Sequence, residues 1–169
     1  MERTDDISTI TMPRWLIAST ITLVVLRLVA LPFESSKALN SPDPIHWIAA
    51  SDFDTKMNPT GKLVLYEFGA DWCEPVKRLE SNVLRNKQIA GMIGSRFVAL
   101  KVRDRLREDG KNTQQVTDLE KKYHVFAFPT LVVAAQDGEA VASLVGSASA
   151  LSTVHFLTRA SRAGRNTVK

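Results

Sequence analysis

The sequence is nearly devoid of cysteine. Cys73 is the single cysteine among 169 residues. One cysteine excludes a disulfide within the chain, and it excludes a metal site built from several thiolates. The three histidines, His46, His124 and His155, are scattered without the close spacing of metal ligands. The sequence therefore predicts no metal and no other cofactor.

Charge is not concentrated either. The 22 basic and 18 acidic residues give a net charge of +4, and the only local bias is a basic last stretch that predicts a solvated tail at residues 163–169. The basic residues of this last stretch, which begins just before the tail, are Arg159, Arg162, Arg165 and Lys169. No signature of a nucleic-acid-binding module is present. We therefore expect no nucleic-acid partner.

One long apolar run is present, at residues 15–33 (WLIASTITLVVLRLVALPF), with Arg27 as its single charge. At about 1.5 Å per residue, a helix of this length spans roughly 28 Å, close to the thickness of a bilayer core. Each strongly apolar residue favours insertion by about 0.3–0.6 kcal/mol, whereas a central arginine costs about 2.5–3.5 kcal/mol. The Arg27 side chain can extend to the nearer membrane–water interface, and Trp15 lies at the opposite end of the run, where an interfacial aromatic residue is expected. The run predicts a transmembrane anchor.

A cleaved signal peptide is the alternative. Residues 15–26 would be its apolar region, and Ser36-Lys37-Ala38 would be a small-residue cleavage site. The acidic side chains of Glu2, Asp5 and Asp6 are unusual ahead of a signal peptide, so the uncleaved anchor is favoured.

The flanking charges predict the orientation of the anchor. Arg3 and Arg14 precede it and only Lys37 follows closely, so the positive-inside rule places residues 1–14 in the cytoplasm. In a bacterium, the chain would then cross the inner membrane once and present its carboxy-terminal domain to the periplasm. Residues 34–44, which are polar and contain two prolines, predict a linker.

Residues 45–162 alternate between segments typical of strands and of helices. Continuous apolar runs bounded by turn residues predict buried strands, and apolar residues at helical spacing predict helices. We expect a strand or short helix at residues 45–53, a strand at 62–70, a helix at 74–95 and a strand at 96–103. A charged loop at 104–112, a helix at 113–125, a hairpin at 130–146 and a helix at 149–162 should follow. This order predicts an α/β domain with a mixed central sheet flanked by helices.

Three local signals refine this order. Asn86-Lys87 should break the helix of residues 74–95, so that a second short helix follows. Asp137-Gly138 should form the turn of the hairpin. The helix of residues 113–125 should present one apolar face, formed by Val116, Leu119 and Tyr123.

Three short segments carry a resemblance to a known family. Ala70-Asp71-Trp72-Cys73, Lys77-Arg78-Leu79-Glu80 and Phe128-Pro129-Thr130 occur in the order and on the elements found in thioredoxins. Residues 62–160 resemble a thioredoxin-like domain, most of all the carboxy-terminal periplasmic domain of the bacterial membrane thiol:disulfide interchange proteins. The resemblance implies a thioredoxin-like fold, with Pro129 in cis opposite Cys73 and helping to bind extended peptide.

The strand-to-helix corner at Cys73 has a physical logic. A cysteine at a helix amino terminus faces unpaired N–H groups and the positive end of the helix dipole, which favour a thiolate. Pro75 is tolerated in the first turn, where its missing N–H would have no partner. Glu67, six residues before Cys73, matches a buried carboxylate that assists proton transfer in the family, although an acid that reaches water at a strand end is an equal alternative.

The candidate site departs from the family at Val76, where the second cysteine of a redox pair is expected. A dithiol enzyme needs a second sulfur to release the mixed disulfide, and valine can neither attack nor leave. Dithiol activity is therefore excluded, and Cys73 remains a candidate catalytic residue only for a monothiol mechanism. The candidate binding residues are Trp72, Glu74, Pro75, Val76, Phe128, Pro129 and Thr130.

Two functions fit these features. The favoured one is a non-catalytic binding, accessory or assembly subunit of a membrane protein complex, in which a lone cysteine is simply a small apolar residue. The alternative is a monothiol reductase, isomerase or chaperone that acts on exported proteins through Cys73.

Overall fold

The structure is a computed structural model that describes residues 42–53 and 60–167, with side chains as far as residue 164. The chain divides into two compact units, Met1–Pro42 and Asp43–Lys169, and the second contains every described element. The expected anchor at residues 15–33 and the alternative cleavage site at Ser36-Lys37-Ala38 lie outside the described residues. Among the described helices, none combines the length and the apolar content that crossing a bilayer requires.

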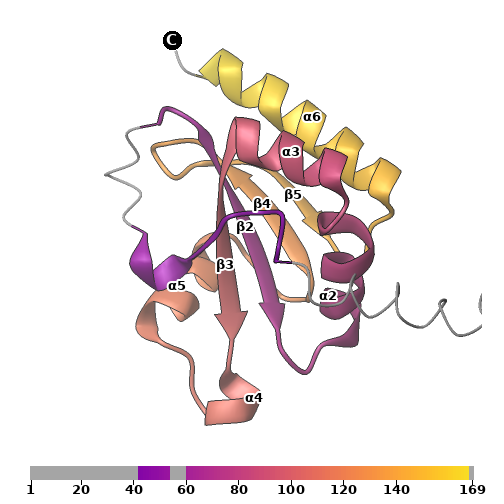
Figure 1. Cartoon of the computed structure of the whole chain (residues 1–169). Coiled ribbons are helices and arrows are strands. Elements are labelled where there is room, and N and C mark those ends of the chain that lie inside the picture. Colours follow the sequence, from indigo (N-terminus) through magenta and orange to yellow (C-terminus); the bar gives the residue numbers. More distant parts are fainter. Residues whose placement is uncertain (1–41, 54–59, 168–169) are drawn as a thin grey trace, which may run out of the picture. The chain divides into compact units, whose positions relative to one another are not determined.

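A five-stranded mixed sheet forms the centre of the domain, in the order β1-β3-β2-β4-β5 (Figure 1). β1 and β2 both run parallel to β3, and the helical segment between β2 and β3 returns the chain to the same end of the sheet, whereas β4 and β5 form an antiparallel hairpin. The strands are β1 (Trp47–Ala49), β2 (Leu63–Ala70), β3 (Phe97–Asp104), β4 (Thr130–Ala134) and β5 (Ala140–Val145). The predicted α/β class and mixed sheet are confirmed.

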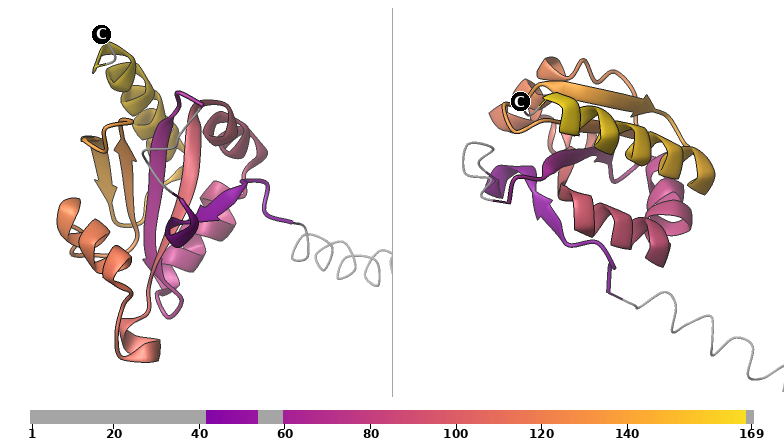
Figure 2. Two further views of the ribbon diagram at one scale, coloured as in Figure 1. Left: turned by 90° about the vertical axis from the view of Figure 1, so that its left-hand side faces the viewer. Right: turned by 90° about the horizontal axis from the view of Figure 1, so that it is seen from above.

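Helices cover both faces of this sheet, and Figure 2 shows α5 on one face and α2 with α3 on the other. The helical elements are η1 (Ala50–Asp52), α2 (Glu74–Leu79), η3 (Glu80–Leu84), α3 (Lys87–Arg96), α4 (Leu106–Asp109), α5 (Gln114–Lys122) and α6 (Ala150–Thr167). The predicted break is confirmed, because Asn86 caps α3 by accepting the N–H groups of Gln88 and Ile89. Between α2 and α3 the chain forms one π-helical segment, η3.

Two expectations about element boundaries were wrong. The segment predicted as a charged loop at residues 104–112 contains the short helix α4, which ends at Gly110 with a φ of 70°. The closing helix continues to Thr167 rather than ending at residue 162, so most of the predicted tail is helical. The cause is packing, since Gly164 is buried and a Cβ there would lie 2.5 Å from the Leu63 side chain.

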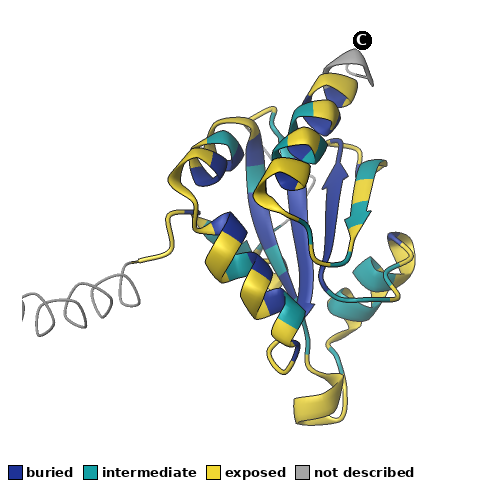
Figure 3. Ribbon diagram, turned by 90° about the vertical axis from the view of Figure 1, so that its right-hand side faces the viewer, coloured by how far each residue is buried: buried dark blue, intermediate teal, exposed yellow. Residues whose placement is uncertain are grey.

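The core consists of two layers, one on each face of the sheet. Alternation along β2 directs Leu65 toward α2, α3 and α6, and it directs Tyr66 and Phe68 toward α5. The predicted apolar face of α5 packs against this second layer. Figure 3 shows buried central strands beside the more exposed β5. The buried sheet holds the ends of β2 and β4 in fixed positions, and the candidate site lies at those ends.

Candidate functional site

Cys73 lies at the corner between β2 and α2. β2 ends at Ala70, and the Cys73 N–H donates to the Ala70 carbonyl at 3.0 Å, which closes the turn. Cys73 is the N-cap of α2, and its own carbonyl accepts the N–H groups of Val76 and Lys77 at 3.0 and 3.3 Å. Pro75 occupies the first turn, where no N–H is needed. The prediction that Cys73 opens a helix is confirmed.

The Cys73 thiol is enclosed by apolar groups. Its side chain is 6% exposed, and it packs with Ala70, Val76 and Phe128. The thiol donates a long hydrogen bond to the Phe128 carbonyl, with 3.8 Å between Sγ and oxygen. The Phe128–Pro129 peptide bond is cis. The structure thus brings Cys73 beside the Phe-Pro-Thr segment, 55 positions away from Phe128 in the sequence, as predicted.

Val76 is held in place by a close approach of β2 and α2. A Cβ on Gly69 would lie 2.8 Å from Val76 Cγ1 and 3.0 Å from Val76 Cγ2, so only glycine fits beneath this side chain. Val76 is 2% exposed and contributes two methyl groups to the apolar cluster around the thiol. The side chain three residues after Cys73 is therefore a packed hydrocarbon with no exchange chemistry.

Glu67 is fully buried, and it does not reach water at the end of a strand. Arg103 Nη1 donates to Glu67 Oε2 at 2.9 Å, whereas Glu67 Oε1 has no hydrogen-bond partner among the described residues. Burial raises the pKa of Glu67, and the positive charge of Arg103 opposes that rise. A role of Glu67 in proton transfer with Cys73 stays a prediction.

Arg103 is the residue of this site that sequence reasoning missed. Its guanidinium contacts Glu67 and Glu80 and lies 3.7 Å from Asp71, and Lys101 Nζ lies 2.7 Å from Glu80. In the sheet, Gly69 pairs with Arg103, and a Cβ on Gly69 would lie 3.0 Å from Arg103 Nη1. Arg103 therefore lies between the sheet and α2, and its charge compensates the buried carboxylate.

The seven predicted binding residues divide by exposure. Val76, Pro129 and Thr130 are buried, and the Thr130 hydroxyl donates to the Ala127 carbonyl at 2.7 Å. Phe128 and Pro75 are half-buried. The exposed ones are Trp72 and Glu74.

Two aromatic side chains are accessible at the loops that flank the thiol. Trp72 is 46% exposed, and its ring lies under the Arg107 guanidinium at 5.1 Å. Phe126, two residues before Phe128, is 84% exposed and was not among the predicted binding residues. An exposed aromatic in an otherwise apolar run cannot be distinguished from a core residue by pattern alone.

The family model for a thioredoxin-like domain matches residues 54–160. The chain belongs to the thioredoxin-like domain family. The solved structure of a thioredoxin from Thermus thermophilus is 20% identical, with a TM-score of 0.61 over 75% of this chain and 94% of the other. A DsbH oxidoreductase is 16% identical, with a TM-score of 0.53 over 72% and 85%. At these identities, the two structures show a shared thioredoxin-like fold.

A further solved structure, the oxidised carboxy-terminal domain of DsbD from Neisseria meningitidis, is 25% identical, with a TM-score of 0.47 over 58% of this chain and 79% of the other. No curated protein matches the chain. The family model alone establishes the thioredoxin-like family, and the narrower resemblance to membrane thiol:disulfide interchange proteins stays a hypothesis.

The chemistry open to this thioredoxin-like site is limited. Cys73 is the only sulfur nucleophile in the sequence, so an attack on a disulfide ends at a mixed disulfide unless another molecule supplies a thiol. Within the described ranges, no group of three or more histidine, cysteine, aspartate or glutamate side chains could hold a metal ion. The site combines a sequestered thiol with an accessible aromatic surface.

Proposed function

We propose that this thioredoxin-like protein is a membrane-anchored binding subunit whose domain recognises partner proteins without thiol turnover. In this proposal, residues 15–33 anchor it in the inner membrane of a bacterium and the domain faces the periplasm. The partner is a membrane protein complex that it assists or helps to assemble. The observation that carries the proposal is Val76, packed at the position from which a second sulfur would act.

The packing around Val76 supports a loss of exchange chemistry. Gly69 leaves room for α2 to lie directly on β2, and the Val76 methyl groups fill the resulting contact. The same contact keeps the Cys73 side chain 6% exposed. A thiol in such surroundings contributes to packing as a small apolar group does.

The exposed part of the site supports binding. The exposed Trp72 adjoins Cys73 and the exposed Phe126 lies two residues before Phe128, and Cys73 Sγ contacts the Phe128 carbonyl, so both aromatics lie on segments that meet at the thiol. Exposed aromatic side chains supply large contact areas, and they are enriched among residues that dominate binding energy. A membrane tether raises the effective concentration of such a surface for partners in the same membrane.

The alternative function is monothiol exchange with exported proteins, and the position of Cys73 favours it. Cys73 caps α2 without a side-chain hydrogen bond to the helix, beside a cis proline. The Cys73 thiolate would attack one sulfur of a disulfide and release the other as a thiolate. A second, external thiol would then have to cleave the mixed disulfide.

Quantitative recovery of partners from native membranes tests the binding proposal. The full chain would carry Trp72→Ala or Phe126→Ala, with Leu151→Ala as the control, since Leu151 is 66% exposed on α6. We expect each aromatic variant to lower the recovered partner severalfold, and the control to match the wild type. Equal recovery with all three variants would contradict binding through this surface.

A further inference from the structure

The two edges of the sheet differ in how they are protected. Proteins protect edge strands by making them short, by adding charges or by adding proline. At one edge, β1 has only three residues. At the other edge, β5 has six residues, Ala140–Val145, without a charge or a proline. The irregularity in its pairing lies at Val133/Ala134, so Ala142–Val145 continue as regular strand.

The free edge of β5 presents backbone groups outward. The Gly146 N–H donates to the Pro129 carbonyl at 2.7 Å, and the register pairs Leu144 with Leu131. Hydrogen-bonded and non-hydrogen-bonded pairs alternate along an antiparallel ladder. Ser143 and Val145 therefore direct their N–H and C=O groups away from β4, and within the described residues no further strand pairs with β5.

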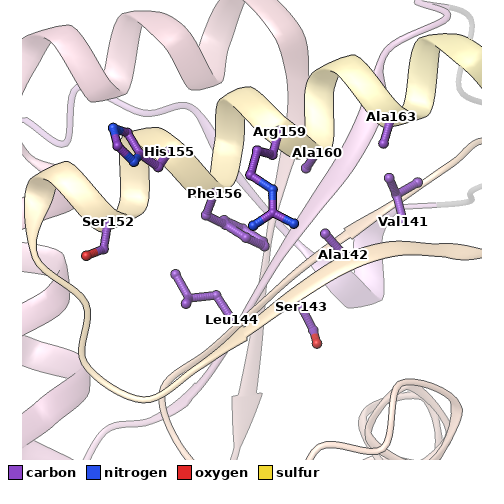
Figure 4. A pocket seen from close by; sticks show the side chains of 10 residues that line it. All are labelled: Val141, Ala142, Ser143, Leu144, Ser152, His155, Phe156, Arg159, Ala160 and Ala163. Carbon is purple, nitrogen blue, oxygen red and sulfur yellow. The ribbon is translucent and has the colours of Figure 1, made fainter.

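A groove runs beside this edge, between β5 and α6, with a volume of about 460 Å³. Its apolar part includes Ala142, Leu144 and Phe156, and its polar part includes His155 and Arg159. Figure 4 shows Phe156 and Arg159 extending from α6 toward β5, with Leu144 on the strand side facing Phe156. The groove thus offers an apolar floor and one strong cation along an unpaired strand.

The charge of this part of the chain is one-sided. Residues 140–169 contain no aspartate or glutamate, whereas they contain Arg159, Arg162, Arg165 and Lys169. Of these basic residues, Arg159 lines the groove, and no aspartate or glutamate is among the described residues that line it, so the groove attracts acidic side chains. Pairing of two copies through β5 would instead bring two sets of arginines together, which like-charge repulsion disfavours.

We propose that the β5–α6 groove is a second interaction surface, which binds an extended acidic segment of a partner protein. The segment adds a strand to β5 through the outward groups of Ser143 and Val145. Its apolar side chains fill the groove over Leu144 and Phe156, and a carboxylate pairs with Arg159. This surface does not use Cys73, so it stands independently of the function proposed for the thiol site.

A labelled synthetic peptide tests the proposal on the full chain in detergent micelles. The probe is a twelve-residue peptide in which every second residue is serine and the residues between alternate valine with glutamate, so that valine and glutamate lie on the same face of the added strand; its control replaces every glutamate with lysine. Fluorescence anisotropy measures binding. Peptide-resolved hydrogen exchange across residues 140–146 reports whether the probe protects β5 amides.

Two matched variants locate the contact. Arg159→Glu reverses a charge in the groove, whereas Arg162→Glu reverses the same charge on an exposed position of α6 that does not line the groove. We expect Arg159→Glu to weaken binding about tenfold, since it removes one ion pair and adds one repulsion. We expect Arg162→Glu to have a much smaller effect. Ser143→Pro, which removes an outward N–H but no bond to β4, should also weaken binding.

Three results would overturn the proposal. Equal losses for Arg159→Glu and Arg162→Glu would show unspecific charge attraction. Equal binding of the lysine peptide would remove the acidic specificity. A stable dimer with protected β5 amides in the absence of peptide would make a second copy, rather than an acidic segment, the occupant of the edge.

Discussion

Replacing Arg103 with methionine should make the stability of this domain strongly dependent on pH. Methionine retains much of the aliphatic stem but removes the guanidinium that donates to Glu67 at 2.9 Å. Glu67 is fully buried, so its carboxylate would then lack the cation that contacts it. Breaking a buried ion pair by removing one partner destabilises proteins by about 3–5 kcal/mol.

The direction of the pH effect follows from the pKa of Glu67. Burial raises this pKa above its ordinary 4.5, so the contribution of Glu67 to stability is fully present below pH 4.5 and is lost as the pH rises through the folded-state value. Arg103 is the strongest influence that lowers this pKa. Its removal raises the pKa further and extends the loss of stability to higher pH.

The size of the effect has an upper limit, because the buried carboxyl can protonate. Keeping Glu67 protonated at pH 7.5, three units above the ordinary 4.5, costs about 4 kcal/mol at 1.36 kcal/mol per unit. At pH 5.5 the same limit is about 1.4 kcal/mol. Arg103→Met should therefore lower the free energy of unfolding more at pH 7.5 than at pH 5.5, and the difference between the two pH values is at most about 3 kcal/mol.

Urea unfolding of the full chain in a non-ionic detergent, followed by tryptophan fluorescence at both pH values, measures this difference. Arg105→Met is the matched control, because Arg105 forms exposed ion pairs with Asp71 and Asp109 and should change stability little at either pH. Arg103→Met combined with Glu67→Gln should lose the extra pH dependence. If Arg103→Met alone destabilises the domain equally at both pH values, the assigned pairing of Glu67 with Arg103 is wrong.

Three further predictions concern the corner and the anchor. Val76→Cys should give measurable disulfide reduction in an insulin assay where the wild type shows little turnover, because a second sulfur then follows Cys73 on α2; no gain would contradict the reading of Val76 as the missing partner. Gly69→Ala should destabilise the domain by about 1–3 kcal/mol through overpacking, and adding Val76→Ala should recover part of this loss because the clashing methyl groups are removed; a strictly additive double variant would refute the contact. Intact-mass analysis of the mature protein should find residues 15–33 retained, whereas a chain that begins near Asn40 would show a cleaved signal peptide.

The fold could be predicted because its signals are local. The apolar run of β2, the Asn86 cap and the Asp137-Gly138 turn are each readable within a few residues. The short helix α4 could not be predicted in this way, because its four residues are all exposed and show no apolar periodicity.

The site could be predicted only in part. The position of Cys73, the cis bond at Pro129 and their proximity followed from the family resemblance, and the structure confirms them. The partner of Glu67 depends on the register between β2 and β3, which brings Arg103 to Glu67 across 36 positions of sequence. No local pattern contains that information. The exposure of Phe126 likewise depends on the path of the segment between α5 and β4, which is not encoded in a local pattern.

The variant Cys73→Ala distinguishes a thiol site that works by binding from one that works by exchange. The variant and the wild type would be expressed at equal levels in the native cell, and their partners would be quantified from membranes under reducing and non-reducing conditions. If the site works by binding, we expect the same partners in the same amounts for both chains, with no band that depends on a disulfide to Cys73. Loss of partners in Cys73→Ala, or mixed disulfides that accumulate on Cys73 in the wild type, would contradict a binding role and favour monothiol exchange.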